Sequence, residues 1–342
     1  YDRSNKRTNE VIAAGTSEAA VTTWTYDSVG RVKTQTDANG NVHSWSYDAR
    51  GQVVAETNAA GTATTYAFDP AGNLLSRTDG AGVTTLWAYD TMNRVTNMSS
   101  GSLGYDYDYD IAGRRTAMRT RLNGVVTEAT TFSYDLNDRL LTKLDPTGYE
   151  LDYAYDSLGN RTNILVNSAS SVTSVVQQAY TYDVRNRIKT ITGNGKTTAY
   201  DYDALGRRTN AVWPNGTTAS YAYDAANQLL SLVHASPTST IASFAYGYDL
   251  GGNRTNMTTL EGVNAYGYDH RNWLTSAAYP DGHVQEFEYD PVGNRIALTS
   301  SSASSVVQTA YTYGPANRLL SSASALETNE YAYDGAGRLT NQ

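Results

Sequence analysis

Hydrophobic and polar positions alternate with a period of two residues along this 342-residue chain. Residues 21–47, for example, read VTTWTYDSVGRVKTQTDANGNVHSWSY, so that Val, Thr, Trp and Tyr alternate with small or polar residues. This period predicts β-strands. The strands are separated by short runs rich in Asp, Asn and Gly, which are typical of tight turns. We therefore expect an all-β protein built from short strands and tight turns.

The alternation is organised into a repeating unit that is marked by Tyr-Asp. The pattern Tyr-Asp-x-x-Gly/Asn-Arg/Asn/Gln begins sixteen times, mostly every 20 or 21 residues and with occasional steps of 24 to 27; only Phe68 replaces the tyrosine and only Gly314 the aspartate. A fixed short period indicates a repeat array, so we expect 1–342 to be a single continuous array of about sixteen units without a separate catalytic domain. The clearest copies of the motif are Tyr26, Asp27, Gly30 and Arg31; Tyr109, Asp110, Gly113 and Arg114; Tyr202, Asp203, Gly206 and Arg207; and Tyr333, Asp334, Gly337 and Arg338.

Each unit contains two turns. In the first, the Asp27 side chain can cap the local backbone and Gly30 can adopt positive φ at low cost. The second turn is Asp37-Ala38-Asn39-Gly40 in one unit and Pro214-Asn215-Gly216 in a later one. Two strands and two turns per unit predict about thirty strands in an antiparallel meander. From Asn93 onward the central residue of the first turn alternates between Gly and Asn or Asp, and one left-handed backbone conformation explains all three.

In every unit except the first, which begins at Tyr1, a second aromatic residue stands two positions before the Tyr-Asp. Residues i and i+2 lie on the same face of a strand, so every second strand presents an aromatic pair that we expect to stack along the sheet. A packing ladder is one interpretation, and a sugar-binding surface is the alternative. Under the alternative, the residues that would contact a glycan are Trp24, Trp45 and Trp87.

Two further features concern the ends of the turns. The arginine that closes the motif is expected to pair with acidic neighbours on adjacent strands, with an anion- or cargo-binding stripe as the alternative.

The longer repeat steps come from insertions at Ser168–Val176, His234–Ile241 and Ser300–Val307, which are rich in Ser, Thr, Ala and Pro. We expect these insertions to form extended or flexible hairpin tips.

The composition excludes several functions. With 26 Lys and Arg against 34 Asp and Glu, the net charge of −8 argues against nucleic acid and against anionic membrane surfaces. The chain has no Cys, which excludes disulfides and thiolate metal sites. No apolar run approaches the roughly 20 residues that span a bilayer, so membrane insertion is not expected.

No sequence signal for catalysis or for a cofactor is present. The four His do not have metal-ligand spacing, the calcium-binding patterns are absent, and there is neither a nucleophile elbow nor a phosphate-binding loop. Turn capping accounts for the repeated Asp without a metal. We expect a protein that is not an enzyme and that binds no cofactor.

With the ordered series of motifs in view, the chain resembles the Rhs/YD-repeat family over essentially its whole length. Relatives of this kind include bacterial Rhs toxins, insecticidal toxin complexes and animal teneurins. The resemblance implies a β-sheet ribbon that spirals into a hollow shell, which encloses a C-terminal toxin domain in the toxins and forms part of an adhesion ectodomain in teneurins. Repeats of this family have also been linked to carbohydrate binding. A secreted or cell-surface bacterial protein is therefore expected.

The sequence also departs from complete Rhs cores. Those end in an Asp-Pro-x-Gly-Leu segment used in self-cleavage, whereas the nearest strings here, Asp69–Gly72 and Asp290–Gly293, are followed by Asn. Self-cleavage is therefore not expected, and no toxin domain is present within 1–342. Because the chain begins inside a repeat, we expect it to be part of a longer polypeptide.

The leading hypothesis is a structural segment of a shell that encapsulates a toxin or other cargo. Thirty strands at about 4.8 Å make a ribbon on the order of 150 Å long, which is too little to close a cage. We therefore expect an open segment whose edge strands pair with further repeats of the parent chain or with another copy. The alternative is a carbohydrate-binding or adhesion module that uses the aromatic face or the loop rim.

Overall fold

The protein was examined as a computed structural model, which describes residues 1–168 and 176–341. Within these residues the chain forms β-strands and turns, with one short 3₁₀ helix and no α-helix. The all-β prediction is confirmed. Most of the predicted insertion at Ser168–Val176 lies outside the described residues.

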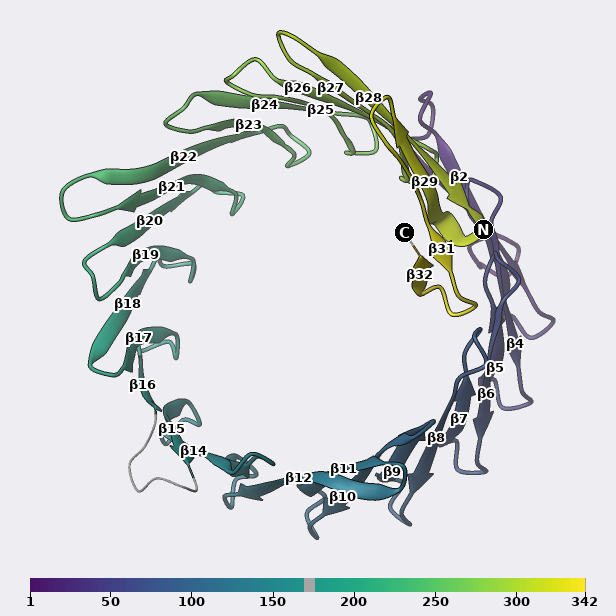
Figure 1. Ribbon diagram of the computed structural model, residues 1–342, viewed down its shortest axis with the longest axis vertical. Helices are drawn as coiled ribbons and strands as arrows, with labels where there is room; N and C mark the ends of the chain where they lie inside the picture. The colour runs from purple at the N-terminus through teal and green to yellow at the C-terminus, as the bar shows by residue number, and fades with distance from the viewer. Residues whose placement is uncertain (169–175, 342) are drawn as a thin grey trace. The chain divides into compact units, whose positions relative to one another are not determined.

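The strands follow one another along the chain with short connections (Figure 1). In the first third they are β1 (Asn9–Ile12), β2 (Ala20–Tyr26), β3 (Val32–Thr36), β4 (Val42–Tyr47), β5 (Val53–Thr57), β6 (Ala63–Phe68), β7 (Leu74–Thr78), β8 (Thr84–Tyr89), β9 (Val95–Ser100) and β10 (Leu103–Tyr109). In the middle they are β11 (Arg115–Leu122), β12 (Val125–Tyr134), β13 (Leu140–Leu144), β14 (Tyr149–Tyr155), β15 (Arg161–Ser168), β16 (Val176–Tyr182), β17 (Ile188–Gly193), β18 (Lys196–Tyr202), β19 (Arg208–Val212), β20 (Thr218–Tyr223) and β21 (Leu229–Ala235). The last are β22 (Thr240–Tyr248), β23 (Arg254–Thr258), β24 (Val263–Tyr268), β25 (Leu274–Ala278), β26 (Val284–Tyr289), β27 (Arg295–Ser301), β28 (Val306–Gly314), the 3₁₀ helix η1 (Pro315–Asn317), β29 (Arg318–Ser324), β30 (Thr328–Glu330), β31 (Ala332–Tyr333) and β32 (Leu339–Asn341).

The strands β1 to β30 belong to one antiparallel sheet, and β31 pairs with β32 in a separate two-stranded sheet. Neighbours in sequence are neighbours in the sheet, as for β2 and β3, where Thr23 lies opposite Thr36. The predicted meander of about thirty strands is confirmed.

A β-bulge recurs beside the Tyr-Asp turns. In the pairing of β2 with β3, Thr25 lies opposite Thr34 but Tyr26 lies opposite Val32, so Lys33 is an extra residue on its strand. The same one-residue shift occurs at Tyr47, Tyr109 and Tyr202. Bulges increase the local twist and redirect side chains, so this one sets how each turn leaves the sheet.

The sheet has little core in the usual sense. Among the described residues the fully buried positions are small or polar, and no large side chain is completely buried. The buried residues are Ala20, Gly104, Ala117, Ala211, Ala219, Ala277, Thr130 and Asn264. The aromatic side chains of the repeat are instead half-buried on one face, while the residues between them are exposed, as along β2. Contacts between neighbouring strands and turns must therefore supply much of the stability.

The contacts cluster into two compact units. Unit 1 combines residues 1–86 with 247–342, and unit 2 contains residues 87–246. In both units the Tyr-Asp turns alternate with the intervening turns, so in an antiparallel meander the two kinds of turn lie on opposite edges of the sheet. We call these the Tyr-Asp edge and the intervening edge.

The two insertions that the structure describes lengthen hairpins rather than forming loose loops. After β21 the backbone amide of Ser236 donates to the carbonyl of Ser239 at 2.8 Å, and after β27 the amide of Ser302 donates to the carbonyl of Ser305 at 2.8 Å. The extended form of the predicted tips is therefore confirmed at His234–Ile241 and Ser300–Val307.

Candidate functional site

The Tyr-Asp turn is held closed by its aspartate. In the first copy the Asp27 amide donates to the Arg31 carbonyl at 2.9 Å, and the Gly30 amide donates to the Asp27 carbonyl at 3.0 Å. The Asp27 carboxylate Oδ1 accepts the backbone amides of Val29 and Arg31 at 3.0 and 2.9 Å. The side chain thus satisfies amides that have no ladder partner inside the turn. Turns at Asp110, Asp203 and Asp334 have the same backbone bonds.

The motif arginine binds within its own turn and then reaches the next one. Arg31 donates from Nε to Asp27 Oδ2 at 2.7 Å and from Nη1 to the backbone carbonyl of Asp48 at 2.9 Å. Its guanidinium also lies 4.6 Å from the ring centre of Tyr47. The Tyr47 hydroxyl completes the link by donating to the carbonyl of Val32 at 2.7 Å.

We call this arrangement the turn lock: aspartate, arginine, and the tyrosine and carbonyl of the next turn. It recurs with the same partners at Arg94, Arg114, Arg139, Arg187 and Arg207. The motif arginines pair with the aspartate four residues earlier, across their own turn. Towards the next unit they reach a backbone carbonyl, and Arg114 also pairs there with the Asp138 carboxylate at 2.8 Å. The expected pairing with acidic neighbours is therefore found mainly across the turn of each arginine, and at Arg114 also in the next unit.

The aromatic rows are held mainly by arginine rather than by ring-to-ring stacking. Tyr47 packs under Arg31, and in several units the aromatic residue two positions before the Tyr-Asp is covered by a second arginine, as Tyr107 is by Arg115 at 4.2 Å. A guanidinium over an aromatic face contributes about 0.5–1 kcal/mol at an exposed site. The predicted ladder is therefore a ladder of aromatic and arginine side chains.

The alternating central residue of the turn adopts the predicted left-handed conformation. Asn93 has φ of 60° and Gly113 of 87°, and the alternation continues with Asp138 at 62° and Gly159 at 87°. The later copies up to Gly337 also have positive φ. Where Gly314 replaces the aspartate, the cap is lost and two successive residues, Ala316 and Asn317, take positive φ.

Hydrogen bonding lowers the pKa of several capping aspartates. The hydrogen bond from the Arg187 side chain is the largest cause at Asp183, where it lowers the pKa from 3.8 to about 2. The backbone amides of Arg31 and Arg94 lower the pKa of Asp27 and Asp90 in the same way. These carboxylates are therefore charged at neutral pH and serve as acceptors.

The three tryptophans singled out for glycan contact are all half-buried. Trp24 lies under Arg7, whose guanidinium is 5.5 Å from the ring. Trp45 stacks on His43 with ring centres 4.4 Å apart, and it lines an open pocket of about 490 Å³ with Tyr66. Trp87 belongs to β8. Trp24 and Trp45 have different partners within unit 1, and Trp87 belongs to unit 2.

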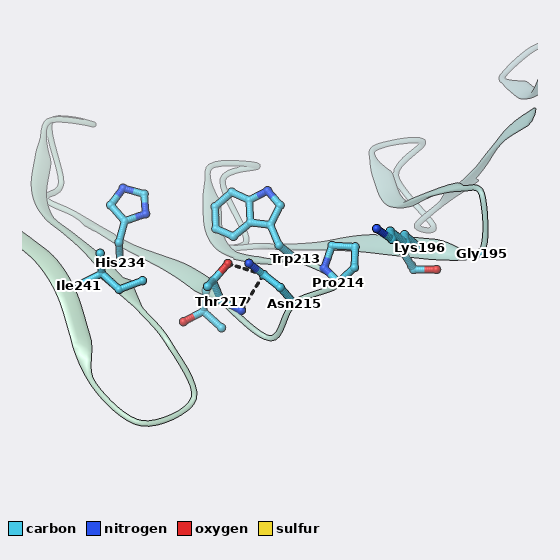
Figure 2. Close-up of a pocket in the computed structure, with 10 residues that line it drawn as sticks. Gly195, Lys196, Trp213, Pro214, Asn215, Thr217, His234 and Ile241 are labelled. Carbon is cyan, nitrogen blue, oxygen red and sulfur yellow. Dashed lines mark hydrogen bonds between the residues drawn. The ribbon is translucent and has the colours of Figure 1, made fainter. Parts of the chain in front are cut away.

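A pocket on the intervening edge of unit 2, around Trp213, was missed by the sequence reasoning (Figure 2). Its volume is about 990 Å³. Trp213 and His234 project to the same side of their strands, with ring centres 6.3 Å apart. We call this pocket the Trp213 notch; its lining residues are Gly195, Lys196, Thr197, Trp213, Pro214, Asn215, Thr217, Thr218, His234 and Ile241.

A sequence signal for the notch did exist. In the comparable turn at Asp37, the aspartate Oδ1 accepts the amides of Asn39 and Asn41. Trp213 occupies the position of that aspartate, and Asn215 caps the turn instead by accepting the Thr217 amide at 3.1 Å and hydroxyl at 2.7 Å. The tryptophan at this capping position is the feature of the sequence that sets the turn apart from the aspartate-capped turns.

Unit 1 contains contacts between residues far apart in sequence. Asn39 Nδ2 donates to Asp290 Oδ2 at 2.7 Å, and Asn41 Nδ2 donates to Asn317 Oδ1 at 3.0 Å. Asn317 Nδ2 in turn donates to Asp37 Oδ2 at 3.1 Å. Each contact joins an intervening turn of residues 1–86 to a Tyr-Asp turn of residues 247–342.

Two further contacts follow the same pattern. Arg338, in the last Tyr-Asp turn, lies 3.8 Å from Asp79 in an intervening turn. Beside them Gly80 and Gly335 pass so close that a Cβ on either would collide with the backbone of the other. Within unit 1, the Tyr-Asp edge of one segment therefore rests on the intervening edge of the other.

No cluster of three or more His, Cys, Asp or Glu suited to a metal ion occurs in 1–168 and 176–341. His270 lies 3.1 Å from Glu18, and His283 Nε2 is 2.6 Å from the Ser300 hydroxyl, so these two side chains have surface or packing partners. Over the same described residues, no helix is long and apolar enough to cross a membrane.

Comparison with known proteins gives a consistent result. A family model for the teneurin YD-shell matches residues 1–172 and 160–302. No curated protein matches the chain.

Several solved structures share the fold. The crystal structure of TcdB2-TccC3-Cdc42 superposes with a TM-score of 0.67 at 15% identity, covering 99% of this chain and 22% of that one. TcdB2-TccC3 without its hypervariable C-terminal region gives a TM-score of 0.63 at 13% identity, with 99% and 21% covered. A Photorhabdus luminescens Tc holotoxin pore with mutant TccC3 gives 0.58 at 14% identity, with 97% and 22% covered. The chain thus spans about a fifth of the length of these proteins.

Proposed function

The chain belongs to the teneurin YD-shell family, and on this premise we propose that it is a non-enzymatic segment of wall in a shell that encloses a toxin or other cargo. The observation that carries the proposal is the turn lock. In each turn lock the charged and aromatic side chains contact their own turn and the next one. Arg31, for example, contacts Asp27 in its own turn and Asp48 and Tyr47 in the next. Side chains committed in this way build a continuous wall.

The structural neighbours support a shell and a secreted or cell-surface location. One of them is a Tc holotoxin pore and another is a complex that contains Cdc42. Because this chain spans about a fifth of those proteins, its cargo and the rest of its wall would come from further repeats or from another polypeptide. A single-layer sheet with half-buried aromatics suits separation of two compartments better than catalysis.

Protease protection tests the enclosure. In the longest natural polypeptide that contains these repeats, we expect the non-repeat segment to resist a protease that rapidly digests the same segment expressed alone. Replacing Arg114, Arg139 and Arg187 with Ala together should weaken the wall and expose the segment, whereas Arg3→Ala, outside any turn lock, should not. A segment that is digested equally fast in both settings would exclude enclosure.

Glycan recognition at Trp45 is a second candidate. Trp45 lines an open pocket together with the aromatic rings of Tyr66 and Phe68. Binding on a glycan array that is lost in Trp45→Ala but kept in Trp24→Ala would support it. An array without reproducible binding would remove this candidate and leave the wall proposal unaffected.

A further inference from the structure

The contacts inside unit 1 define which edges of this sheet fit together. At each of the recorded junctions a Tyr-Asp turn from residues 247–342 meets an intervening turn from residues 1–86. Val292 lies at the tip of the turn whose Asp290 binds Asn39, and its side chain is only half-exposed. Leu250, whose turn takes no part in a recorded junction, is fully exposed at 109%. The tip of a turn at the junction is therefore less exposed than the tip of this turn outside it.

The Tyr-Asp edge of unit 2 carries a row of uncovered aliphatic tips. In six successive turns, one residue between the aspartate and the positive-φ position is a large apolar side chain with an exposed fraction between 62% and 103%. These residues are Met92, Ile111, Leu136, Leu158, Val184 and Leu205. Because successive Tyr-Asp turns are two strands apart, the tips are spaced at roughly 10 Å. The row thus presents one exposed apolar side chain per turn at a regular spacing.

The opposite edge of unit 2 carries the Trp213 notch. The strands β21 and β22 are longer than β19 and β20, and Pro237 at the tip of their hairpin reaches Gly216, where a Cβ would be 3.0 Å from the proline ring. The rings of Trp213 and His234 line the concavity beside this hairpin (Figure 2). A pocket of about 990 Å³ is at the upper end of the usual range for ligand sites. It can take the whole tip of a turn.

The lining of the notch suits an aliphatic tip with a polar flank. Trp213, Pro214 and Ile241 present apolar surface, and Ile241 is 55% exposed. Lys196 also lines the notch. The apolar part of the lining therefore matches the aliphatic tips on the Tyr-Asp edge of a second sheet of this kind.

We propose that the Trp213 notch binds an aliphatic tip from the Tyr-Asp edge of a second copy of this chain, so that copies associate edge to edge. This contact concerns assembly and does not depend on whether the wall encloses cargo. The two edges are different surfaces, so the contact is head-to-tail and leaves a free notch and a free row of tips at the ends of each assembly. The expected products are an open series of oligomers and not a closed dimer.

Sedimentation velocity over a range of concentrations tests the proposal. The weight-average sedimentation coefficient of the intact chain should rise with concentration, and Trp213→Ala should shift this rise to at least tenfold higher concentration. Replacing all six tips with Ser should have the same effect. Trp24→Ala, which changes an aromatic residue outside the notch, should associate like the unaltered chain. Ile241→Asp provides a second notch variant at an exposed position in case Trp213→Ala fails to fold.

Mixing the variants is the decisive step. The Trp213→Ala chain keeps its tips and the six-serine chain keeps its notch, so an equimolar mixture should form a one-to-one heterodimer that neither forms alone. Three results would overturn the proposal. The unaltered chain could stay monomeric at every concentration, both sets of substitutions could leave association unchanged, or the mixture could form no heterodimer. A saccharide that binds the chain in a Trp213-dependent manner without any self-association would also overturn it, by assigning the notch to a different ligand.

Discussion

Asn39 and Asp290 are joined by a hydrogen bond of 2.7 Å from Nδ2 to Oδ2, although 251 residues separate them in the sequence. The bond connects an intervening turn to a Tyr-Asp turn, and Asn41 and Asn317 repeat the connection beside it. A sheet whose other side-chain contacts are mostly between neighbouring turns thus also has a long-range junction. This junction fixes which edges of the wall can meet.

Cysteine cross-linking tests the junction. The chain has no native Cys, so Asn39→Cys combined with Asp290→Cys places the only two thiols at the contact. A short bifunctional maleimide should cross-link them within one chain, with a faster-migrating band on a denaturing gel. The control pair, Asn39→Cys with Asp334→Cys, uses a turn that approaches Asp79 instead. Equal yields from both pairs would mean that the junction does not persist in solution.

The tyrosine hydroxyl is expected to contribute measurably to the turn lock. The Tyr202 hydroxyl donates to the carbonyl of Ile188 at 2.9 Å. Tyr202→Phe removes that donor and keeps the ring under Arg187, so it should lower the free energy of unfolding by about 1 kcal/mol. Urea denaturation measures the loss. Tyr149→Phe is the matched control, because the Tyr149 side chain is 42% exposed, and an equal loss there would contradict the assignment.

The central position of the turn should tolerate Asn but not a β-branched residue. Gly206 has φ of 89°, and a Cβ there would meet Arg187 Nη1 at an unstrained 3.7 Å. The positive φ, and not the space around the side chain, therefore limits which residues this position tolerates. Gly206→Asn should cost well under 1 kcal/mol, and Gly206→Val should cost about 1–2 kcal/mol. The two variants are compared by thermal and urea unfolding, and a Val variant as stable as the Asn variant would show that the turn does not need positive φ.

Much of this local structure could be predicted from the sequence. Asp27 and Gly30 define a turn through chemistry that acts within four residues, so strands, turns and the alternating φ followed from the pattern. The hydrogen bond from Arg31 to the carbonyl of Asp48 could not be predicted in the same way, because Asp48 belongs to the next unit and its position relative to Arg31 depends on how the strands between them pair. The junction between Asn39 and Asp290 depends on how distant segments meet, and no local pattern encodes that. The tryptophan at a capping position was a sequence signal for the Trp213 notch, but the repeat pattern alone does not indicate a pocket there.

Acid should weaken the wall through the capping aspartates. The pKa of Asp183 is lowered in the folded protein to about 2, mainly by Arg187, and Asp27 and Asp90 shift in the same direction. A carboxyl group whose pKa is lower in the folded state stabilises the fold at pH values above its unfolded pKa, and this contribution is lost as pH falls through the folded pKa. The melting temperature should therefore fall steeply between about pH 4 and pH 2.

Asp183→Asn supplies the control for this acid dependence. The variant should be less stable at neutral pH, because the charged acceptor is gone, and it should lose less stability between pH 4 and pH 2. Parallel melting curves for the variant and the unaltered chain over that interval would mean that the aspartate caps do not cause the acid dependence.

The most direct test of the proposed wall is an electron cryomicroscopy map of the longest natural polypeptide that contains these repeats. The account predicts that the sheet formed by these residues is one layer of a wall around a lumen, continued by further repeats, with density for non-repeat polypeptide inside. A map in which both faces of this sheet are open to solvent, with no enclosed polypeptide, would contradict it.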